Sequence, residues 1–152
     1  MNLVAPVSAI MTKSLITVSP DDPVKVVKDI FEKNKIHHIP VVRLNKIVGI
    51  ISKSDFSAYY AGMSRHFEDR FINDTLLQLH KAEEIMTKRL AKVESTDQIA
   101  VVIEVFKENI LHALPVVDND ELVGIVTIHD IIKLISREKI HDSDYKSVSE
   151  IS

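Results

Sequence analysis

Apolar residues recur along the chain at two alternating spacings, that of a strand and that of a helix. Residues 15–18 form a short β-prone segment, and apolar positions within residues 24–31 follow every three or four residues, as in a helix. Residues 39–42 and 47–51 are apolar, β-branched runs separated by four residues, which predicts a hairpin. A second helix is expected to begin near Ser54. The pattern therefore predicts the order strand, helix, strand, strand, helix.

The ends of these elements carry residues with known positional preferences. Asp22 and Pro23 predict an N-cap and a first-turn proline for the first helix. Asn34 predicts its end, because asparagine tolerates the left-handed conformation of a C-terminal cap. Pro40 and Pro115 lack a backbone N–H, so we expect them at a strand start, an edge or a bulge.

The whole pattern occurs twice. Residues 10–57 align without a gap with residues 85–132, and about 19 of roughly 48 aligned pairs are identical. The second copy repeats the helix over residues 99–106 and the hairpin over residues 114–117 and 122–126. Two copies of one unit usually bury their apolar faces against each other, here about a pseudo-twofold axis. The predicted fold class is α/β (α+β), with two βαββα units packed by their sheets.

The repeat also suggests how the chain divides. Aromatic residues and leucines among the charges of residues 58–84 predict a continued helix and a connecting helix. We expect a first unit over residues 1–61, a connecting helical segment over 62–84 and a second unit over 85–140. A polar, frayed tail is expected over residues 141–152.

Composition and charge narrow the function classes. The chain has 152 residues, 19 basic and 22 acidic, with a formal net charge of −3 and no long block of either sign. A nucleic-acid partner normally needs a basic face, so none is expected. Cysteine is absent, which excludes disulfides and thiolate chemistry. Without a secretory signal pattern or a membrane-length apolar run, we expect a soluble cytoplasmic protein with no membrane partner.

The sequence lacks the motifs of several common nucleotide-binding sites and active sites. Gly49, Gly62 and Gly124 are too few and too scattered for a dinucleotide fingerprint or a phosphate loop. The sequence contains neither Gly-x-Ser-x-Gly nor His-Glu-x-x-His. A lone carboxylate such as Asp55 or Asp130 is a weak catalyst without a partner base or metal. We therefore expect no enzyme activity and no catalytic residues.

Histidines raise the question of a metal site. His37, His38 and His112 could cluster if the two units pack together. Adjacent strand residues point to opposite faces, however, and no acidic residue stands at a ligand spacing from His37 or His38. We therefore expect no metal, and interpret these histidines as a polar, hydrogen-bonded lining.

The motif Ser52-x-x-Asp55, repeated as Thr127-x-x-Asp130, allows two interpretations. A hydroxyl residue followed by an acid at the start of a helix is typical of helix capping. Clefts also form at the carboxyl ends of strands, where a carboxylate can accept hydrogen bonds from two sugar hydroxyls. The repetition of the motif at a pseudo-symmetric interface favours a binding cleft.

The motifs Ile-Met-Thr, His-x-x-Pro-Val-Val and Val-Gly-Ile-x-Ser/Thr-x-x-Asp, in this order and twice, resemble the tandem cystathionine-β-synthase-type domain. This CBS pair, or Bateman module, packs two βαββα units into a flat disc with two pseudo-equivalent clefts. The resemblance covers about residues 10–132. It implies clefts for adenosine-containing ligands such as AMP, ADP, ATP or S-adenosylmethionine.

By the same resemblance, Asp55 and Asp130 would hold ribose hydroxyls with the help of Ser52 and Thr127. The adenine would lie between the segments that follow each Ile-Met pair, and the motif histidines would lie near the first phosphate. The complete expected set is Thr12, Ile16, Thr17, Ile36, His37, His38, Ser52, Asp55, Thr87, Ala91, Lys92, Leu111, His112, Thr127 and Asp130.

The chain departs from the family pattern at one position. Many nucleotide-binding members carry arginine or lysine after the motif histidine, where this chain has His38 and Ala113. A polyphosphate needs several full positive charges, so AMP or S-adenosylmethionine is favoured over ATP. The difference between His38 and Ala113 predicts unequal sites.

Taken together, these features predict a stand-alone regulatory module, with energy sensing among its roles and no obligatory cofactor. It would bind an adenosyl ligand and report it to an unknown partner protein by changing the angle or pairing of its discs. A homodimer is expected from the resemblance. The alternatives are a ligand-independent dimerisation or interaction scaffold, in which the motifs only cap helices, and an enzyme with an unrecognised site.

Overall fold

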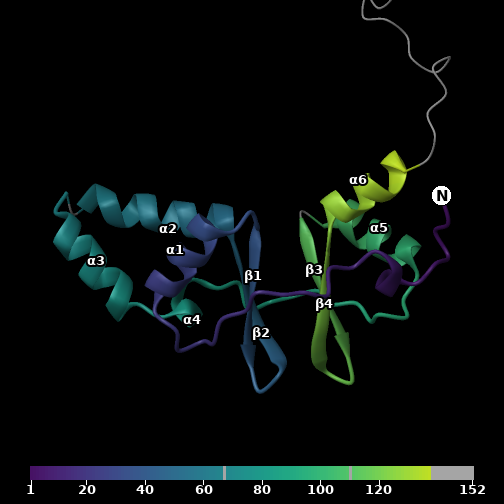
Figure 1. Cartoon of the computed structure of the whole chain (residues 1–152), viewed down its shortest axis with the longest axis horizontal. Helices are drawn as coiled ribbons and strands as arrows, with labels where there is room; N and C mark the ends of the chain where they lie inside the picture. Colours follow the sequence, from purple (N-terminus) through teal and green to yellow (C-terminus); the bar gives the residue numbers. More distant parts are fainter. Residues whose placement is uncertain (67, 110, 138–152) are drawn as a thin grey trace, which may run out of the picture.

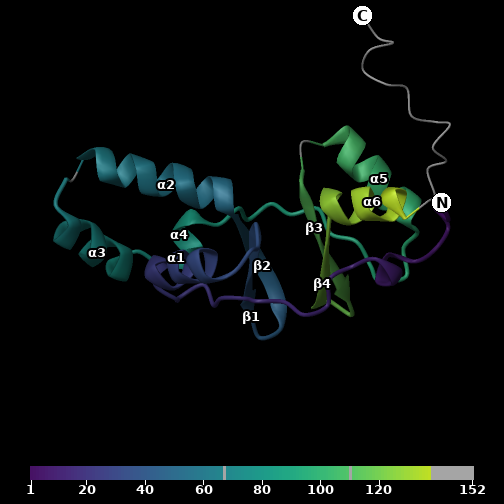
Figure 2. The same ribbon diagram turned by 45° about the horizontal axis from the view of Figure 1, so that its top comes forward.

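Two antiparallel hairpins lie side by side at the centre of the molecule, and the helices cover their outer sides (Figure 1). The computed structural model describes residues 1–66, 68–109 and 111–137. The helices α1 to α4 lie at one end, and α5 and α6 lie at the other (Figures 1 and 2). The predicted mixed fold of two units packed by their sheets is confirmed. The expected tail over residues 141–152 lies outside the described residues.

The first unit contains α1 (Val24–Lys33), β1 (His38–Arg43), β2 (Lys46–Ser52) and α2 (Lys53–His66). The connecting helices are α3 (Arg70–Leu79) and α4 (Ala82–Ile85), and a short 3-10 helix, η1 (Val7–Ala9), precedes the first unit. The second unit contains α5 (Ile99–Glu108), β3 (Ala113–Asp118), β4 (Glu121–Thr127) and α6 (Ile128–Ser136).

The strand expected over residues 15–18 is reduced to one parallel bridge, between Val18 and Val41. Val18 N–H donates to the Pro40 carbonyl at 3.1 Å, and Val42 N–H donates to the Val18 carbonyl at 2.8 Å. Further pairing is prevented because Thr12, six residues earlier, already pairs with Ile125 in the other unit. The intervening residues cross between the units and cannot also lie along β1.

The predicted N-cap of α1 is wrong, whereas Asn34 ends the helix as predicted but without the expected left-handed conformation. Pro23, not Asp22, is the N-cap, and the Asp22 carboxylate instead accepts a hydrogen bond from Ser19 N–H at 2.8 Å. Val24 N–H donates to the His80 carbonyl at 2.9 Å, so the connecting segment supplies an acceptor at this helix start. Asn34 has extended backbone, with φ −129°, and ends the helix by donating its side-chain amide to a carbonyl one turn earlier.

Both hairpins turn through two residues with positive φ. Leu44 and Asn45 have φ of 51° and 64°, and Asn119 and Asp120 have φ of 48° and 67°. Two consecutive left-handed residues match the right-handed twist of the strands that they join. Pro40 and Pro115 lie inside β1 and β3, next to a register shift one residue later, as expected for residues near a bulge.

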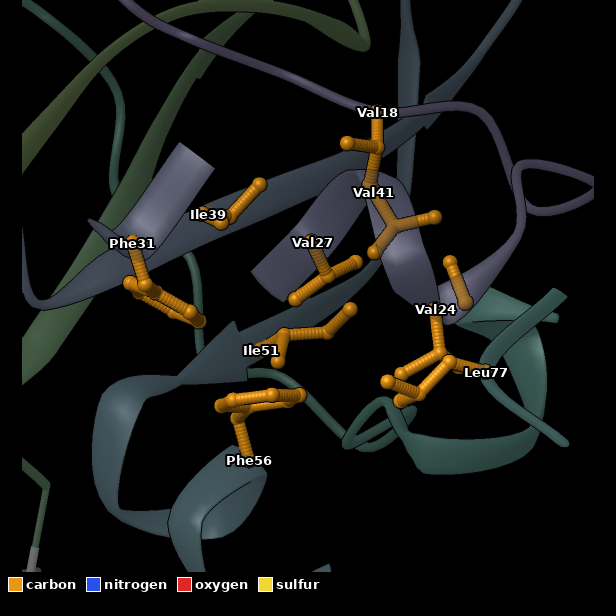
Figure 3. Close-up of a cluster of buried hydrophobic side chains, with 10 residues drawn as sticks. Val18, Val24, Val27, Phe31, Ile39, Val41, Ile51, Phe56 and Leu77 are labelled. Carbon is orange, nitrogen blue, oxygen red and sulfur yellow. The ribbon is translucent and has the colours of Figure 1, made fainter. Parts of the chain in front are cut away.

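Each unit has its own core. In the first unit, residues of α1, β1, β2 and α2 pack with Leu77 of the connecting helix α3 (Figure 3). In the second unit, Val7 of η1 packs with Val102 and the apolar residues of β3 and β4. The N-terminal segment therefore completes the core of the more distant unit. Among the described residues, no helix has both the length and the apolar character needed to span a membrane.

Candidate functional site

A cleft of about 1060 Å³ lies between the two units. Its lining includes residues at the junctions of β2 with α2 and of β4 with α6. These two junctions lie on the same side of the molecule (Figure 1). Both copies of the Ser/Thr-x-x-Asp motif line it. Residues expected in two clefts therefore border one continuous space.

The first copy of the motif leaves its carboxylate open. Asp55 N–H donates to Ser52 Oγ at 3.0 Å, and Ser52 Oγ lies 3.2 Å from Ser54 Oγ. Asp55 is exposed, and its carboxylate makes no hydrogen bond or ion pair with the described part of the chain. Ser52 thus caps α2 by its hydroxyl, while Asp55 keeps both carboxylate oxygens available.

The second copy is a closed capping box. Asp130 Oδ2 accepts hydrogen bonds from the Thr127 N–H and from Thr127 Oγ1, both at 2.8 Å. In return, Thr127 Oγ1 accepts the Asp130 N–H at 3.3 Å. Capping therefore occupies one carboxylate oxygen of this copy. The two copies differ here, in addition to the expected difference between His38 and Ala113.

Four histidines border the cleft: His37, His38, His112 and His129. His37 and His112 hold equivalent positions: their carbonyls accept the backbone N–H of Lys53 at 2.8 Å and of Ile128 at 3.1 Å, the first residues of α2 and α6. His38 begins β1 and pairs with Ser52. Burial lowers the pKa of His38, neighbouring His37 and His112 lower it further, and only Asp55 opposes them. His38 is thus biased towards the neutral form.

The next question is whether the described residues could hold a metal ion. Among these residues, no group of three or more histidine, aspartate or glutamate side chains is arranged to hold a metal ion.

Most of the expected ligand residues border the cleft. They are Thr12, Ile16, Ile36, His37, His38, Ser52, Asp55, Thr87, Ala91, Leu111, His112, Thr127 and Asp130. Thr17 and Lys92 hold equivalent positions in the two units and lie outside the lining. Each directly follows a lining residue, Ile16 or Ala91, and successive side chains of an extended chain point to opposite sides.

Sequence reasoning missed the cations of the cleft. Lys35, Lys53, Arg89 and Lys133 all border it. None of them stands at the position after the motif histidine, where the family pattern directs attention. In the sequence they differ from other basic residues only in standing close to the motifs. That signal is too weak to identify them, because other lysines also stand close to the motifs.

The CBS domain family model matches the chain twice, over residues 7–62 and 82–137. An inosine-5'-monophosphate dehydrogenase of Thermoplasma acidophilum is 27% identical over 143 residues, which are 93% of this chain and 25% of that enzyme. The chain thus spans about a quarter of the length of that relative. A CBS domain-containing protein of Dictyostelium discoideum is 29% identical over 133 residues, which are 85% of this chain and 90% of that protein.

Solved structures resemble the whole fold. The CBS domain of a membrane protein from Sphaerobacter thermophilus superimposes with a TM-score of 0.72 at 28% identity, covering 86% of this chain and 87% of that one. The CBS domain pair of protein MJ0100 gives a TM-score of 0.73 at 27% identity and covers 89% and 98%. That pair was solved in complex with 5'-methylthioadenosine and S-adenosylmethionine.

Proposed function

The chain belongs to the CBS domain family, and on this premise we propose that it is a regulatory module that binds an adenosine-containing ligand between its two units. The observation that carries the proposal is a cleft of about 1060 Å³ bordered by both Ser/Thr-x-x-Asp motifs. Its volume is at the upper end of the range of small-molecule sites. The adenosyl ligands of the related MJ0100 pair support this choice of ligand class.

In this proposal Asp55 and Asp130 accept hydrogen bonds from ribose hydroxyls. Asp55 can offer both oxygens, because its carboxylate has no partner among the described residues. Asp130 can offer its Oδ1, since Oδ2 holds the capping box. The half of the cleft at Asp55 should therefore bind the sugar more strongly.

The adenine would lie among the apolar lining residues, which come from both units: Ile16, Ile36, Leu90 and Leu111. A flat base between aliphatic side chains loses water without leaving a buried charge. Because each unit contributes to the enclosure, a bound ligand would favour one relative arrangement of the units. Such differential binding is what allows a ligand to signal to a partner protein, and we propose a homodimer as the form that does so.

A second function, a ligand-independent interaction scaffold, is favoured by one observation. The complete capping box of Thr127 and Asp130 gives that motif a structural role without any ligand. The open carboxylate of Asp55 has no such role, and this difference makes ligand binding the better-supported function.

A thermal-shift panel tests the proposal against the scaffold. It would contain AMP, ADP, ATP, S-adenosylmethionine, NAD and cyclic dinucleotides. A ligand at 100 times its Kd adds about 2.7 kcal/mol to the unfolding free energy, which raises the Tm of a chain of this size by several degrees. Absence of any shift at millimolar ligand would refute the proposed ligand binding and favour the scaffold.

If a ligand binds, Asp55→Asn should weaken binding more than Asp130→Asn does. Asp74→Asn is a matched control, because Asp74 lies on α3 and outside the cleft lining. Equal affinity in all three variants would refute the assignment of the sugar to the two carboxylates.

A further inference from the structure

A smaller cavity of about 300 Å³, the outer pocket, lies between residues 9–12 and α6. Ile10 and Met11, which border it, pack on the core of the second unit. The outer pocket is therefore enclosed by elements that pack on the second unit, whereas the cleft lies between the two units. The two spaces share three lining residues, Thr12, Asp130 and Lys133.

Two cations and one carboxylate border the outer pocket. Asp130, Lys133 and Arg137 are spaced by three and four residues along α6 and its C-cap, so they share one face of the helix. Neither Lys133 nor Arg137 forms an ion pair with another described residue. Asp130 Oδ2 is engaged by Thr127, which leaves Oδ1 as an acceptor. The lining thus offers two cationic donors and one acceptor oxygen, with one net positive charge.

The repeat shows that this charge is particular to the second unit. The charged positions of the outer pocket have counterparts of different character in the first unit: Ala9, Lys133 and Arg137 stand where that unit has Glu84, Ala58 and Gly62. An acid in the first unit is therefore replaced by alanine, and two uncharged residues are replaced by cations. Helix capping does not require this change, because the capping hydroxyl and acid are present in both copies.

The same place in the first unit also holds a larger side chain. Tyr59 is the counterpart of Leu134, and its hydroxyl is buried. Burial and the charge of Glu84 raise the pKa of Tyr59, so the Glu84 carboxylate lies near that hydroxyl. A tyrosine and an acid thus stand in the first unit where the second unit has a leucine, an alanine and an open, basic space.

We propose that the outer pocket binds a small carboxylic acid that also carries a hydrogen-bond donor, either an amino acid or a hydroxy acid. Its carboxylate binds Lys133 and Arg137, since a guanidinium matches a carboxylate with two parallel hydrogen bonds. Its ammonium or hydroxyl group donates to Asp130. One net positive charge in the lining matches a single carboxylate better than a phosphate dianion.

The size and apolar part of the lining agree with this ligand class. About 300 Å³ is at the lower end of the range of ligand pockets, which suits a molecule smaller than a nucleoside. Ile10 and Leu134 offer aliphatic surface to its carbon chain. The inference goes beyond the proposed function, because this ligand is not the adenosyl compound of the cleft. Both ligands use Asp130 Oδ1, so occupation of the outer pocket leaves Asp55 as the available sugar acceptor.

Nuclear magnetic resonance of the isotope-labelled whole chain tests the proposal. The probes are the common amino acids, lactate and 3-hydroxybutyrate, with acetate and inorganic phosphate for comparison, all at an ionic strength held constant with sodium chloride. We expect at least one amino or hydroxy acid to give saturable shifts of the backbone amides of residues 9–12 and 133–137. It should bind at least about fivefold more tightly than acetate, which lacks the donor for Asp130. Residues 58–62 and 84–86, the equivalent places of the first unit, should not shift.

Two variants address the outer pocket without altering the lining of the cleft. Arg137 and Ala9 border the outer pocket alone. Arg137→Gln should weaken binding about tenfold. Ala9→Glu places the acid of the first unit beside the two cations and should abolish binding, and the exposure of Ala9 allows the longer side chain. Lys33→Gln is the matched control, because Lys33 lies in the last turn of α1, as Lys133 does in α6, and borders neither space.

Saturable shifts at the outer pocket that are lost in Arg137→Gln and in Ala9→Glu, and kept in Lys33→Gln, would support the inference. It would be overturned if no amino or hydroxy acid bound, if acetate or inorganic phosphate bound as tightly, or if both pocket variants bound like the wild type. Shifts confined to cleft residues such as His37 and Ser52 would also overturn it. Each of these results leaves the proposed function standing, because adenosyl ligands test that function separately.

Discussion

The side chain of Met86 lies directly against Gly49 of the other unit: a Cβ on Gly49 would come within 2.7 Å of Met86 Cγ. Met11 holds the equivalent place at Gly124, where a Cβ would come 2.7 Å from Met11 Sδ. The threonines after the two methionines pair with the residues after the two glycines, Thr87 with Ile50 and Thr12 with Ile125. The Ile-Met-Thr and Val-Gly-Ile motifs therefore recur together because each packs on its counterpart across the interface between units.

Alanine at either of these glycines should destabilise the fold. Gly49→Ala and Gly124→Ala should each lower the unfolding free energy by about 1 to 3 kcal/mol, the usual cost of overpacking. Gly62→Ala is the matched control: nothing lies within 4 Å of a Cβ there, and alanine inside α2 should add about 0.5 to 1 kcal/mol. Chemical denaturation measures all three, and equal stability of the three variants would contradict the packing argument.

The two copies of the acidic motif should differ in their effect on stability. Asp130→Ala removes the acceptor of two hydrogen bonds from Thr127 and should cost about 1 kcal/mol. Asp55→Ala removes no hydrogen bond to a described residue, so it should change stability by less than about 0.5 kcal/mol. Urea denaturation without ligand compares the variants, and equal losses would show that the motifs are structurally equivalent.

The connecting helices α3 and α4 should contribute to the stability of the first unit and not act only as a linker. Leu77 of α3 is fully buried in the first core, so Leu77→Ala should cost about 2 to 5 kcal/mol. Leu79, two residues later, is 69% exposed, and Leu79→Ala should stay within about 0.5 kcal/mol of wild type. Hydrogen exchange of the β1 and β2 amides provides a second measurement, and unchanged protection in Leu77→Ala would show that α3 is dispensable.

The free energy of unfolding should fall at low pH partly because Asp118 becomes protonated. Hydrogen bonds from the Ser95 side chain and backbone N–H lower the pKa of the Asp118 carboxyl, and the backbone bond measures 3.0 Å. A folded-state pKa below the unfolded value means that this stabilisation is present above the unfolded pKa and is lost as pH falls through the folded-state pKa. Asp118→Asn should therefore flatten the fall of stability below about pH 4.5. Thermal unfolding at a series of pH values measures this. If the Tm of Asp118→Asn fell at low pH as steeply as that of the wild type, the role given to Asp118 would be contradicted.

Helices and hairpins followed from local periodicity. The apolar spacing of α1 and the β-branched runs of β1 and β2 placed those elements to within about one or two residues. The same holds in the second unit, because the repeat carries the same pattern. Periodicity works for these elements because each buries one face against its own unit.

Caps and short pairings were predicted less well. Asp22 is of a residue type that is preferred at N-caps. The N–H of Val24, however, donates to the carbonyl of His80, more than fifty residues later in the chain. The strand expected over residues 15–18 was shortened because Thr12 pairs with the other unit. In both cases a partner distant in sequence supplied hydrogen bonds that local rules assign to neighbours.

The repeat, the fold class and both Ser/Thr-x-x-Asp motifs could be predicted before the structure was known, because they depend on residue type and spacing alone. The folded structure was needed to show that the two motifs border one cleft, that Asp130 is engaged in capping while Asp55 stays open, and that four cations and four histidines line the same space. Charge and desolvation depend on distances between residues far apart in the chain, and folding alone sets those distances.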